Sequence, residues 1–345
     1  MKVCVIGGSG LVGRVTVNDL LRQGKDVKVI DVKPPKIKVD YSRVDISDVN
    51  STSREIKQCD FVVNAAQYYF NLKVMEASLI AGVSYADLGG LFWMTKEQLP
   101  LSEKFEKEGI LGVVGIGAEP GITNVSASYL VKKYGTPRQI KFRNGWITKG
   151  NKFNWSIDTQ LDEATMSAVV WEEDKYVKYP PFSKSELFKF SNPVGEVKVY
   201  LTIHSELATI PYSFPGVSKV DWMEGGEGIE TLRLLANLGF GDKEEVMGIS
   251  PRKYLRSLLE KKELLGSNPD GWESAVTTVD NKHGIEVLMP PQGEFDGTQL
   301  GAGSAPAVAL EVGMKGEGVL PPEKTIEPEP FLNSLKRRGF KVFFF

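Results

Sequence analysis

Cysteine and histidine are scarce in this chain of 345 residues, which contains two of each. The cysteines, Cys4 and Cys59, lie far apart in the sequence, and no Cys-x-x-Cys pair is present. A disulfide-rich scaffold and a zinc site built on closely spaced cysteines are therefore excluded. Two isolated thiols fit a reducing compartment, so we expect a cytoplasmic protein without a bound metal.

An excess of charge of one sign is also absent, since 42 Lys and Arg balance 44 Asp and Glu. The chain therefore offers no basic field to nucleic acid or to an anionic membrane surface. No apolar run approaches the roughly 20 residues that cross a bilayer. The apolar residues 3–6 run straight into glycines, which is not the pattern of a signal peptide. We expect a soluble protein of about two domains.

The first third of the chain alternates short β-branched runs with helical patterns. Strands are predicted at 2–6, 26–30, 39–44, 60–64, 83–88 and 110–116, and helices at 14–23, 72–81 and 96–108. This alternation is typical of βαβ units, which build a parallel sheet covered by helices. The sequence therefore predicts an α/β fold.

A glycine-rich turn joins the first predicted strand to the first predicted helix. It fits the pattern G-x-G-x-x-G and consists of Gly8, Ser9, Gly10, Leu11, Val12 and Gly13. Gly8 permits a tight turn, Gly10 lets the backbone approach a pyrophosphate, and Gly13 allows close packing of the helix on the strand. The loop therefore predicts a dinucleotide site, with the phosphates at the helix N-terminus. Gly7 permits a second register, Gly7/Gly10/Gly13, which the sequence leaves open.

Acidic residues end the second and third predicted strands. Asp31 is placed to accept hydrogen bonds from the adenosine ribose, which favours NAD over NADP. Three lysines follow closely and would tolerate a 2′-phosphate, so NADP stays open. Asp45 is expected near the adenine.

The pattern changes after Gly121. Alternating segments at 139–148 and 196–204 predict strands, 230–238 and 251–262 predict helices, and 285–289 predicts another strand. Such a mixture is typical of an α+β domain. A Gly- and Ala-rich stretch at 301–312 predicts a helix packed closely on other backbone, and 331–345 predicts a helix followed by a strand.

Several short motifs occur in a fixed order along nearly the whole chain. They are Val63-Asn64-Ala65-Ala66-Gln67, Ala81-Gly82-Val83-Ser84-Tyr85-Ala86-Asp87, Gly117-Ala118-Glu119-Pro120-Gly121-Ile122-Thr123-Asn124, Asn154-Trp155-Ser156, His204-Ser205-Glu206 and Gly318-Val319-Leu320-Pro321-Pro322-Glu323. In this order they resemble the saccharopine dehydrogenase (saccharopine reductase) family, which includes lysine 6-dehydrogenases and carboxynorspermidine dehydrogenases.

The resemblance implies a Rossmann domain, a doubly wound parallel sheet formed by residues 1–124 and 305–345. An α+β substrate and dimerisation domain is inserted at 125–304. It implies an NAD(P)-dependent oxidoreductase that transfers hydride at a C–N bond of lysine or a lysine-like amino acid, of the lysine 6-dehydrogenase or saccharopine dehydrogenase type. It also implies that the protein forms a homodimer. Besides the cofactor, its expected ligand is a small amino-acid substrate.

Site residues are expected beyond the carboxyl ends of the strands, where ligands of such sheets bind. Asn64, Ala65 and Ala66 are expected to line the cofactor. The expected substrate contacts are Tyr85, Glu119, Arg143, Asn144 and Trp155.

Three residues are candidates for proton transfer. Asp87 ends a predicted strand, where a carboxylate in a closing cleft can have a raised pKa. His204 and Glu206 would share one face of a strand. These two residues could instead form an ion pair that faces solvent and has no catalytic role, and the sequence leaves this alternative open.

A non-catalytic dinucleotide-binding redox sensor related to short-chain reductases is the alternative function. The cofactor residues are better supported than the catalytic ones, which is why the alternative stays open. Tyr129 and Lys133 even form Tyr-x-x-x-Lys, but no serine lies at the required distance upstream. Turnover of an amino acid discriminates the two, because a sensor binds NAD(P) without it.

Overall fold

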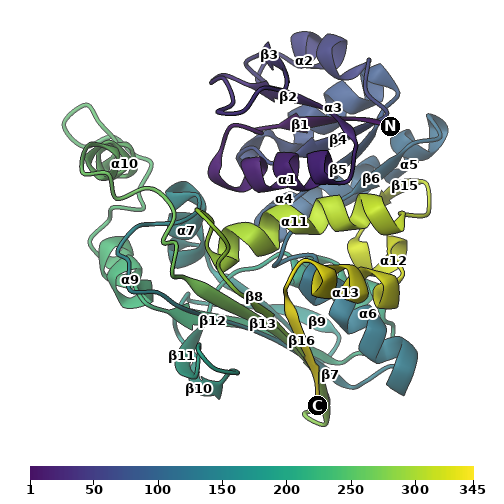
Figure 1. Ribbon diagram of the computed structural model, residues 1–345. Coiled ribbons are helices and arrows are strands. Elements are labelled where there is room, and N and C mark those ends of the chain that lie inside the picture. The colour runs from purple at the N-terminus through teal and green to yellow at the C-terminus, as the bar shows by residue number, and fades with distance from the viewer.

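The computed structural model describes residues 1–345 and contains two sheets (Figure 1). The first is a seven-stranded parallel sheet in the order β15-β6-β5-β4-β1-β2-β3. Its strands are β1 (Lys2–Ile6), β2 (Asp26–Asp31), β3 (Asp40–Arg43), β4 (Phe61–Asn64), β5 (Ser84–Asp87), β6 (Leu111–Val113) and β15 (Gly318–Leu320). The predicted parallel sheet is confirmed.

Two apolar layers cover this sheet because successive strand residues point to opposite faces. On β1, Val3 and Val5 belong to one buried cluster, whereas Cys4 and Ile6 belong to another. The helices and turns of this part of the chain are α1 (Leu11–Arg22), α2 (Val49–Ile56), η1 (Tyr68–Phe70), α3 (Asn71–Ala81), α4 (Leu91–Gln98), η2 (Leu99–Leu101) and α5 (Ser102–Lys107).

The second sheet is a nine-stranded mixed sheet with the central order β10-β11-β12-β7-β13-β14-β16. Its remaining strands, β8 and β9, extend from β12. Its strands are β7 (Gln139–Ile147), β8 (Ala168–Glu172), β9 (Lys175–Tyr179), β10 (Ser185–Lys189), β11 (Glu196–Leu201), β12 (Lys219–Gly226), β13 (Trp272–Val279), β14 (His283–Met289) and β16 (Lys341–Phe344). Because β12 and β7 are parallel and the other pairs are antiparallel, this sheet confirms the α+β character.

Helices connect and cover the second sheet. They are α6 (Ile122–Tyr134), α7 (Ile157–Thr165), η3 (Glu206–Ala208), α8 (Ile210–Ser213), α9 (Ile229–Asn237), α10 (Pro251–Lys261), α11 (Gly297–Val312), α12 (Pro322–Thr325) and α13 (Pro328–Arg337). Figure 1 shows α11 between the two sheets, in contact with α1 on one side and with β13 and β14 on the other. A Cβ atom on Gly303 would lie 2.7 Å from the backbone oxygen of Val12, which confirms the predicted close packing of this helix.

The C-terminal segment contributes to both sheets. β15 pairs with β6 in the first sheet, whereas β16 pairs with β14 in the second. The expectation that all of 305–345 belongs with the first domain is therefore wrong for the last strand. Its apolar residues extend the second sheet, where Phe345 packs over Gly284.

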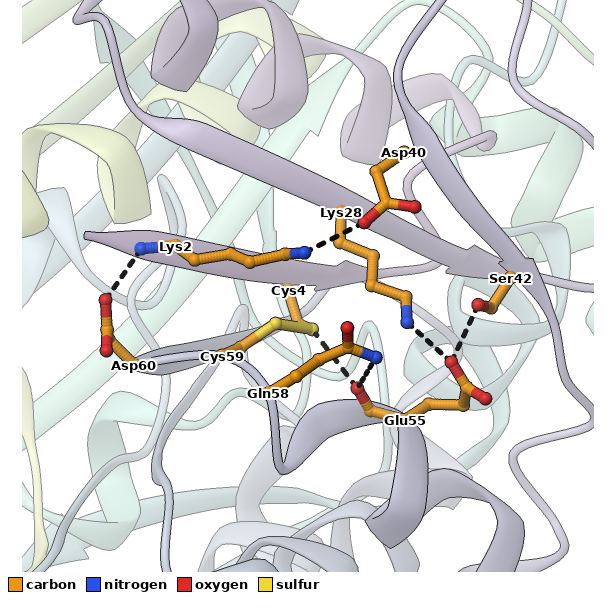
Figure 2. Close-up of a disulfide and its surroundings, with 9 residues drawn as sticks. All are labelled: Lys2, Cys4, Lys28, Asp40, Ser42, Glu55, Gln58, Cys59 and Asp60. Carbon is orange, nitrogen blue, oxygen red and sulfur yellow. Dashed lines mark hydrogen bonds and ion pairs between the residues drawn. A yellow bond between two sulfur atoms is a disulfide. The ribbon is translucent and has the colours of Figure 1, made fainter.

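A disulfide joins Cys4 in β1 to Cys59 in the turn before β4, with 5.9 Å between the Cα atoms (Figure 2). The expectation of two isolated thiols is wrong, because β1 and β4 are neighbours in the sheet although they are distant in the chain. Figure 2 also shows the ion pair between Lys28 and Glu55 beside the disulfide. The prediction of a reducing compartment is based on two free thiols, so the disulfide removes its support.

Helices in this fold are all too short, or too polar, to cross a lipid bilayer. The cytoplasmic location and the homodimer stay predictions.

Candidate active site

The glycine loop forms a cradle at the carboxyl ends of β1 and β4. Gly7 has a φ of 73°, which favours glycine, and a Cβ atom there would lie 2.7 Å from the nitrogen of Ala66. A Cβ atom on Gly13 would lie 2.2 Å from the carbonyl oxygen of Gly7. The structure therefore selects the Gly7/Gly10/Gly13 register, in which Gly8 packs against the core side chains.

This cradle fits a dinucleotide. α1 begins at Leu11, and its N-cap residue Gly10 supplies no side-chain hydrogen bond. The N–H groups of the first helical turn, at Leu11, Val12 and Gly13, are therefore left for a phosphate. The missing side chains at the glycines leave room for it.

Three further cofactor candidates lie at the carboxyl ends of their strands, as expected. Asp31 accepts hydrogen bonds from two backbone nitrogens, one of them that of Ser9 at 3.1 Å, so its carboxylate lies against the glycine loop. Asn64 is buried and accepts a hydrogen bond from the nitrogen of Ala66 at 3.2 Å. Asp45 lies in the exposed loop after β3. Their contacts with the cofactor stay predictions.

Asp87 is fully engaged by its own domain. Its carboxylate accepts hydrogen bonds from the Tyr85 hydroxyl at 2.9 Å and the Gln98 amide at 2.5 Å. It also accepts from the backbone nitrogens of Gly89 and Gly115, each at 2.8 Å. Oδ1 therefore holds the loops that follow β5 and β6, whereas Oδ2 is occupied by Tyr85 and Gln98. Burial raises the pKa of Asp87, as expected, but the network occupies both oxygens, which corrects the expectation of a base there. It also places Tyr85 in the core rather than against a substrate.

One face of the second sheet carries the polar residues of the site. Asn144 on β7 lies opposite Ala275 on β13, and its amide donates to Glu273 at 2.9 Å. Arg143 directly precedes Asn144 on β7 and therefore points to the opposite face of the sheet. There its guanidinium donates to Asp221 and to Glu186, each at 2.5 Å. The expectation that Arg143 binds a substrate carboxylate is wrong, because its side chain lies on the face opposite to Asn144 and is already paired with two carboxylates of the protein.

His204 and Glu206 form a buried pair on this polar face. Glu206 Oε2 is hydrogen-bonded to His204 Nδ1, and Glu206 Oε1 accepts from the Thr123 hydroxyl at 2.7 Å. The His204 ring stacks on Trp222 with 3.7 Å between centroids. The pair is 4% and 0% exposed, so the solvent-facing alternative is wrong.

The backbone of this pair also differs from the prediction. β11 ends at Leu201 and the turn η3 begins at Glu206, so a bend rather than a strand brings the two side chains together. His204 Nε2 has no partner in the protein. Nε2 is therefore available to a substrate, whereas the hydrogen bond to Glu206 fixes Nδ1.

Further carboxyl groups gather around the pair. Glu119, in the loop after β6, and Glu273 each have one buried oxygen without a partner. Glu224 on β12 accepts from the Thr202 hydroxyl at 2.6 Å and has no cationic partner. Burial raises the pKa of Glu119 and Glu224, and it raises the pKa of Glu273 to about 7. The cluster is therefore short of positive charge.

A cavity of about 490 Å³ continues from this cluster. Glu224 and Glu163 line it, together with apolar residues of α9 and α10. Trp155, expected as a substrate contact, lies in its wall. The cavity gives the site room for an extended ligand.

Contacts between the two domains surround the site. The Ser156 hydroxyl donates to Gln67 at 2.8 Å, and the Tyr68 hydroxyl donates to Asp162 at 2.7 Å. These bonds join the loop after β4, which belongs to the cofactor cradle, to α7 beside the cavity. Asn124 caps α6 by accepting from the nitrogen of Gly121.

The buried carboxyls predict a stability that falls as the pH rises. Glu273 has a pKa of about 7 in the folded protein against 4.5 ordinarily, so the folded state binds more protons than the unfolded chain between these values. The free energy of unfolding therefore decreases from about pH 4.5 to 7. We expect a lower Tm at pH 8 than at pH 5.5, and a smaller difference for Glu273→Gln. If the difference in Tm between pH 5.5 and pH 8 is the same in Glu273→Gln as in the unmodified protein, the raised pKa does not belong to Glu273.

Glu163, Glu224 and Glu273 do not emerge from the sequence motifs. Glu224 and Glu273 lie at buried positions of β12 and β13, two strands that the sequence patterns do not predict. Glu163 lies on a short helix rich in acidic residues, where an acid ordinarily faces water. Only the fold shows that Glu163 points inward.

Family comparisons cover almost the whole chain. Residues 3–113 match the saccharopine dehydrogenase NADP binding domain. Residues 117–340 match the saccharopine dehydrogenase C-terminal domain. The boundary between the two matches falls in the loop after β6, which carries Glu119.

Curated relatives include enzymes named for polyamine-related compounds. A carboxynorspermidine synthase from Vibrio alginolyticus is 31% identical over 229 residues, which are 59% of this chain and 55% of the relative. A carboxyaminopropylagmatine dehydrogenase from Synechocystis sp. is 25% identical over 305 residues, 79% of this chain and 76% of the relative. The matched part thus spans about half the length of the first of these relatives.

A solved structure shares the whole fold. Saccharopine dehydrogenase (L-Glu forming) from Saccharomyces cerevisiae superimposes with a TM-score of 0.68 at 16% identity. The match covers 100% of this chain and 99% of that one, so both domains and their arrangement are shared.

Proposed function

This chain belongs to the saccharopine dehydrogenase family of oxidoreductases and uses a nicotinamide dinucleotide, and we propose that it transfers hydride at a C–N bond of lysine or a lysine-like amine. The observation that carries this proposal is the buried His204–Glu206 pair, which lies among carboxyl groups that lack a cationic partner. An amine supplies the positive charge that such a site needs.

The bound cofactor supplies a hydride acceptor in the direction of oxidation. The amine carbon loses a hydride and the amine nitrogen loses a proton, which leaves a C=N bond for water to attack. His204 Nε2 is the free ring atom that takes this proton, while Glu206 fixes the tautomer through Nδ1 and stabilises the charged ring. Glu119, Asn144 and Glu273 orient the amine on the facing side.

The relatives support a substrate with an amino-acid carbon joined through nitrogen to an aminoalkyl chain. Carboxynorspermidine, in the name of one relative, carries this arrangement, and carboxyaminopropylagmatine, in the name of the other, carries a guanidinoalkyl chain in place of the aminoalkyl chain. Lysine and saccharopine share the C–N bond to be oxidised. The proposal therefore includes both kinds of substrate.

A spectrophotometric screen tests the function. Lysine, saccharopine and carboxynorspermidine are each offered with NAD and with NADP, and formation of the reduced cofactor is followed. We expect turnover with at least one of them. Tight cofactor binding without any turnover would support the redox-sensor alternative instead.

Asp31 predicts a preference for NAD. Its carboxylate lies against the glycine loop, where it can accept hydrogen bonds from ribose hydroxyls and would repel a 2′-phosphate. Asp31→Ala is expected to weaken NAD binding about 10–100-fold, since hydrogen bonds to a charged group contribute roughly 1.5–3 kcal/mol. Asp26→Ala, at the other end of β2, is the control. Equal affinity of the unmodified protein for NAD and NADP in calorimetry would contradict the preference.

A further inference from the structure

Glu163 is a buried carboxylate that the rest of the protein does not use. It is 2% exposed, and no hydrogen bond or ion pair reaches it. Two nearby cations, Arg252 and Lys243, are engaged elsewhere, because both pair with the neighbouring Asp162, at 2.7 and 3.5 Å. Lys152 also lines the cavity, but it is an exposed residue and forms no ion pair with Glu163. An unpaired buried carboxylate is costly, so a partner from outside the chain is expected.

Glu163 points into the cavity beside the proposed reaction site. It lines the 490 Å³ cavity together with Glu224, whose second oxygen is also unpaired. Burial raises the pKa of Glu163, and the charges of Glu224, Asp162 and Glu206 raise it further. Two carboxylates therefore share one compartment, next to the His204–Glu206 pair. In addition, the amide nitrogen of Gln160, in the same wall, is buried without a partner.

Apolar side chains make up another part of the cavity lining. Leu232 and Leu235 of α9 and Leu255 and Leu259 of α10 form it, and Trp146 lies at the end of β7. Such a surface suits methylene groups. The part of the cavity formed by these leucines with Glu163 and Glu224 therefore matches a chain that is aliphatic along its length and cationic at its end.

We propose that Glu163 and Glu224 form a subsite for a second ammonium group, which does not react, so that the preferred substrates contain an alkyl diamine or polyamine chain. This proposal rests on the proposed function, since it assigns the far end of the same substrate. It separates the candidates named above: lysine ends at its reacting amine, whereas a polyamine chain continues beyond it to another cation. Glu163 and Glu224 thereby determine specificity and do not take part in hydride or proton transfer.

Direct binding tests the subsite without any turnover. Calorimetry on the full chain saturated with NAD compares 1,4-diaminobutane with butylamine, which has the same carbon chain and one cation fewer. We expect the diamine to bind at least 10-fold more tightly. Glu163→Gln and Glu224→Gln should each remove most of this difference. Agmatine, titrated in parallel, shows whether a guanidinium is accepted in place of the ammonium.

A matched control and a folding check accompany these variants. Glu260→Gln removes the same charge from the exposed side of α10, whose inner side lines the cavity, and should change the affinity less than 2-fold. Glu163→Gln should melt no lower than the unmodified protein, because it removes a buried charge and breaks no hydrogen bond.

The outcomes separate this proposal from the proposed function. If butylamine binds as tightly as the diamine and Glu163→Gln changes neither, the subsite is wrong even where C–N oxidation is found. If the diamine binds in a Glu163-dependent manner but no amine is oxidised, the subsite stands and the proposed function fails. With an active substrate, Glu163→Gln should raise KM at least 10-fold and leave kcat within about 3-fold.

Discussion

Replacing His204 with asparagine is expected to lower kcat by about 10²–10⁴-fold, the usual contribution of a positioned acid–base group. Asparagine keeps a polar group near Glu206 and Trp222 but cannot carry the substrate proton. Because the amine is held by other groups, KM and the affinity for NAD should change only a few-fold. Steady-state kinetics on the substrate found in the screen, with calorimetry for NAD, measures both effects.

Two comparisons make this expectation specific. His283→Asn alters the only other histidine, which stacks on Tyr134 at the start of β14, and should leave kcat unchanged. Glu206→Gln keeps the shape of the pair but removes the charge that stabilises the protonated ring, so it should lower kcat and shift the pH profile. If His204→Asn retains more than a tenth of the activity with an unaltered pH profile, another group transfers the proton.

The cofactor half of the site could be predicted from the sequence because its signals are local. β1 is a continuous apolar run, as expected for a strand buried on both faces, and the glycine loop follows it directly. The choice between Gly7 and Gly8 could not be made from the pattern. It depends on the approach of Ala66, a residue of the loop after β4.

The substrate half depends on contacts between distant segments. His204 and Glu206 could be paired because they are two residues apart, although the predicted strand is a bend. Arg143 and Asn144 could not be separated without knowing which side of β7 faces the first domain. The strand β12 carries the charged residues Asp221 and Glu224 and for that reason does not resemble a buried strand, although it lies in the centre of the sheet.

The pairing of the two cysteines also depends on a contact between distant segments of the chain. A separation of 55 residues gave no sign that Cys4 and Cys59 would meet, because strand order is a property of the whole sheet. Cys4 is 0% exposed and Cys59 is 6% exposed, and both belong to the apolar cluster beneath α2 and α3. The disulfide therefore lies inside the cofactor domain rather than on its surface.

Reduction of this disulfide is expected to destabilise the protein. Closing a loop of this length lowers the entropy of the unfolded chain by an amount worth about 4 kcal/mol. At roughly 2–4 °C for each kcal/mol, the Tm should fall by roughly 10 °C. Differential scanning calorimetry with and without dithiothreitol measures the shift, and thiol titration of the denatured protein shows whether the bond is present.

A double variant, Cys4→Ala with Cys59→Ala, provides the control for this effect. It should melt near the temperature of the reduced protein and should not respond to dithiothreitol. Because β1 leads to Gly7 and β4 leads to Ala65 and Ala66, which contact each other in the cofactor cradle, the affinity for NAD should fall along with the Tm. Two free thiols in the denatured, unreduced protein, together with an unchanged Tm on reduction, would show that the cysteines are not joined. Loss of stability without loss of NAD affinity would instead show that the hydrogen bonds between β1 and β4 hold the cradle together by themselves.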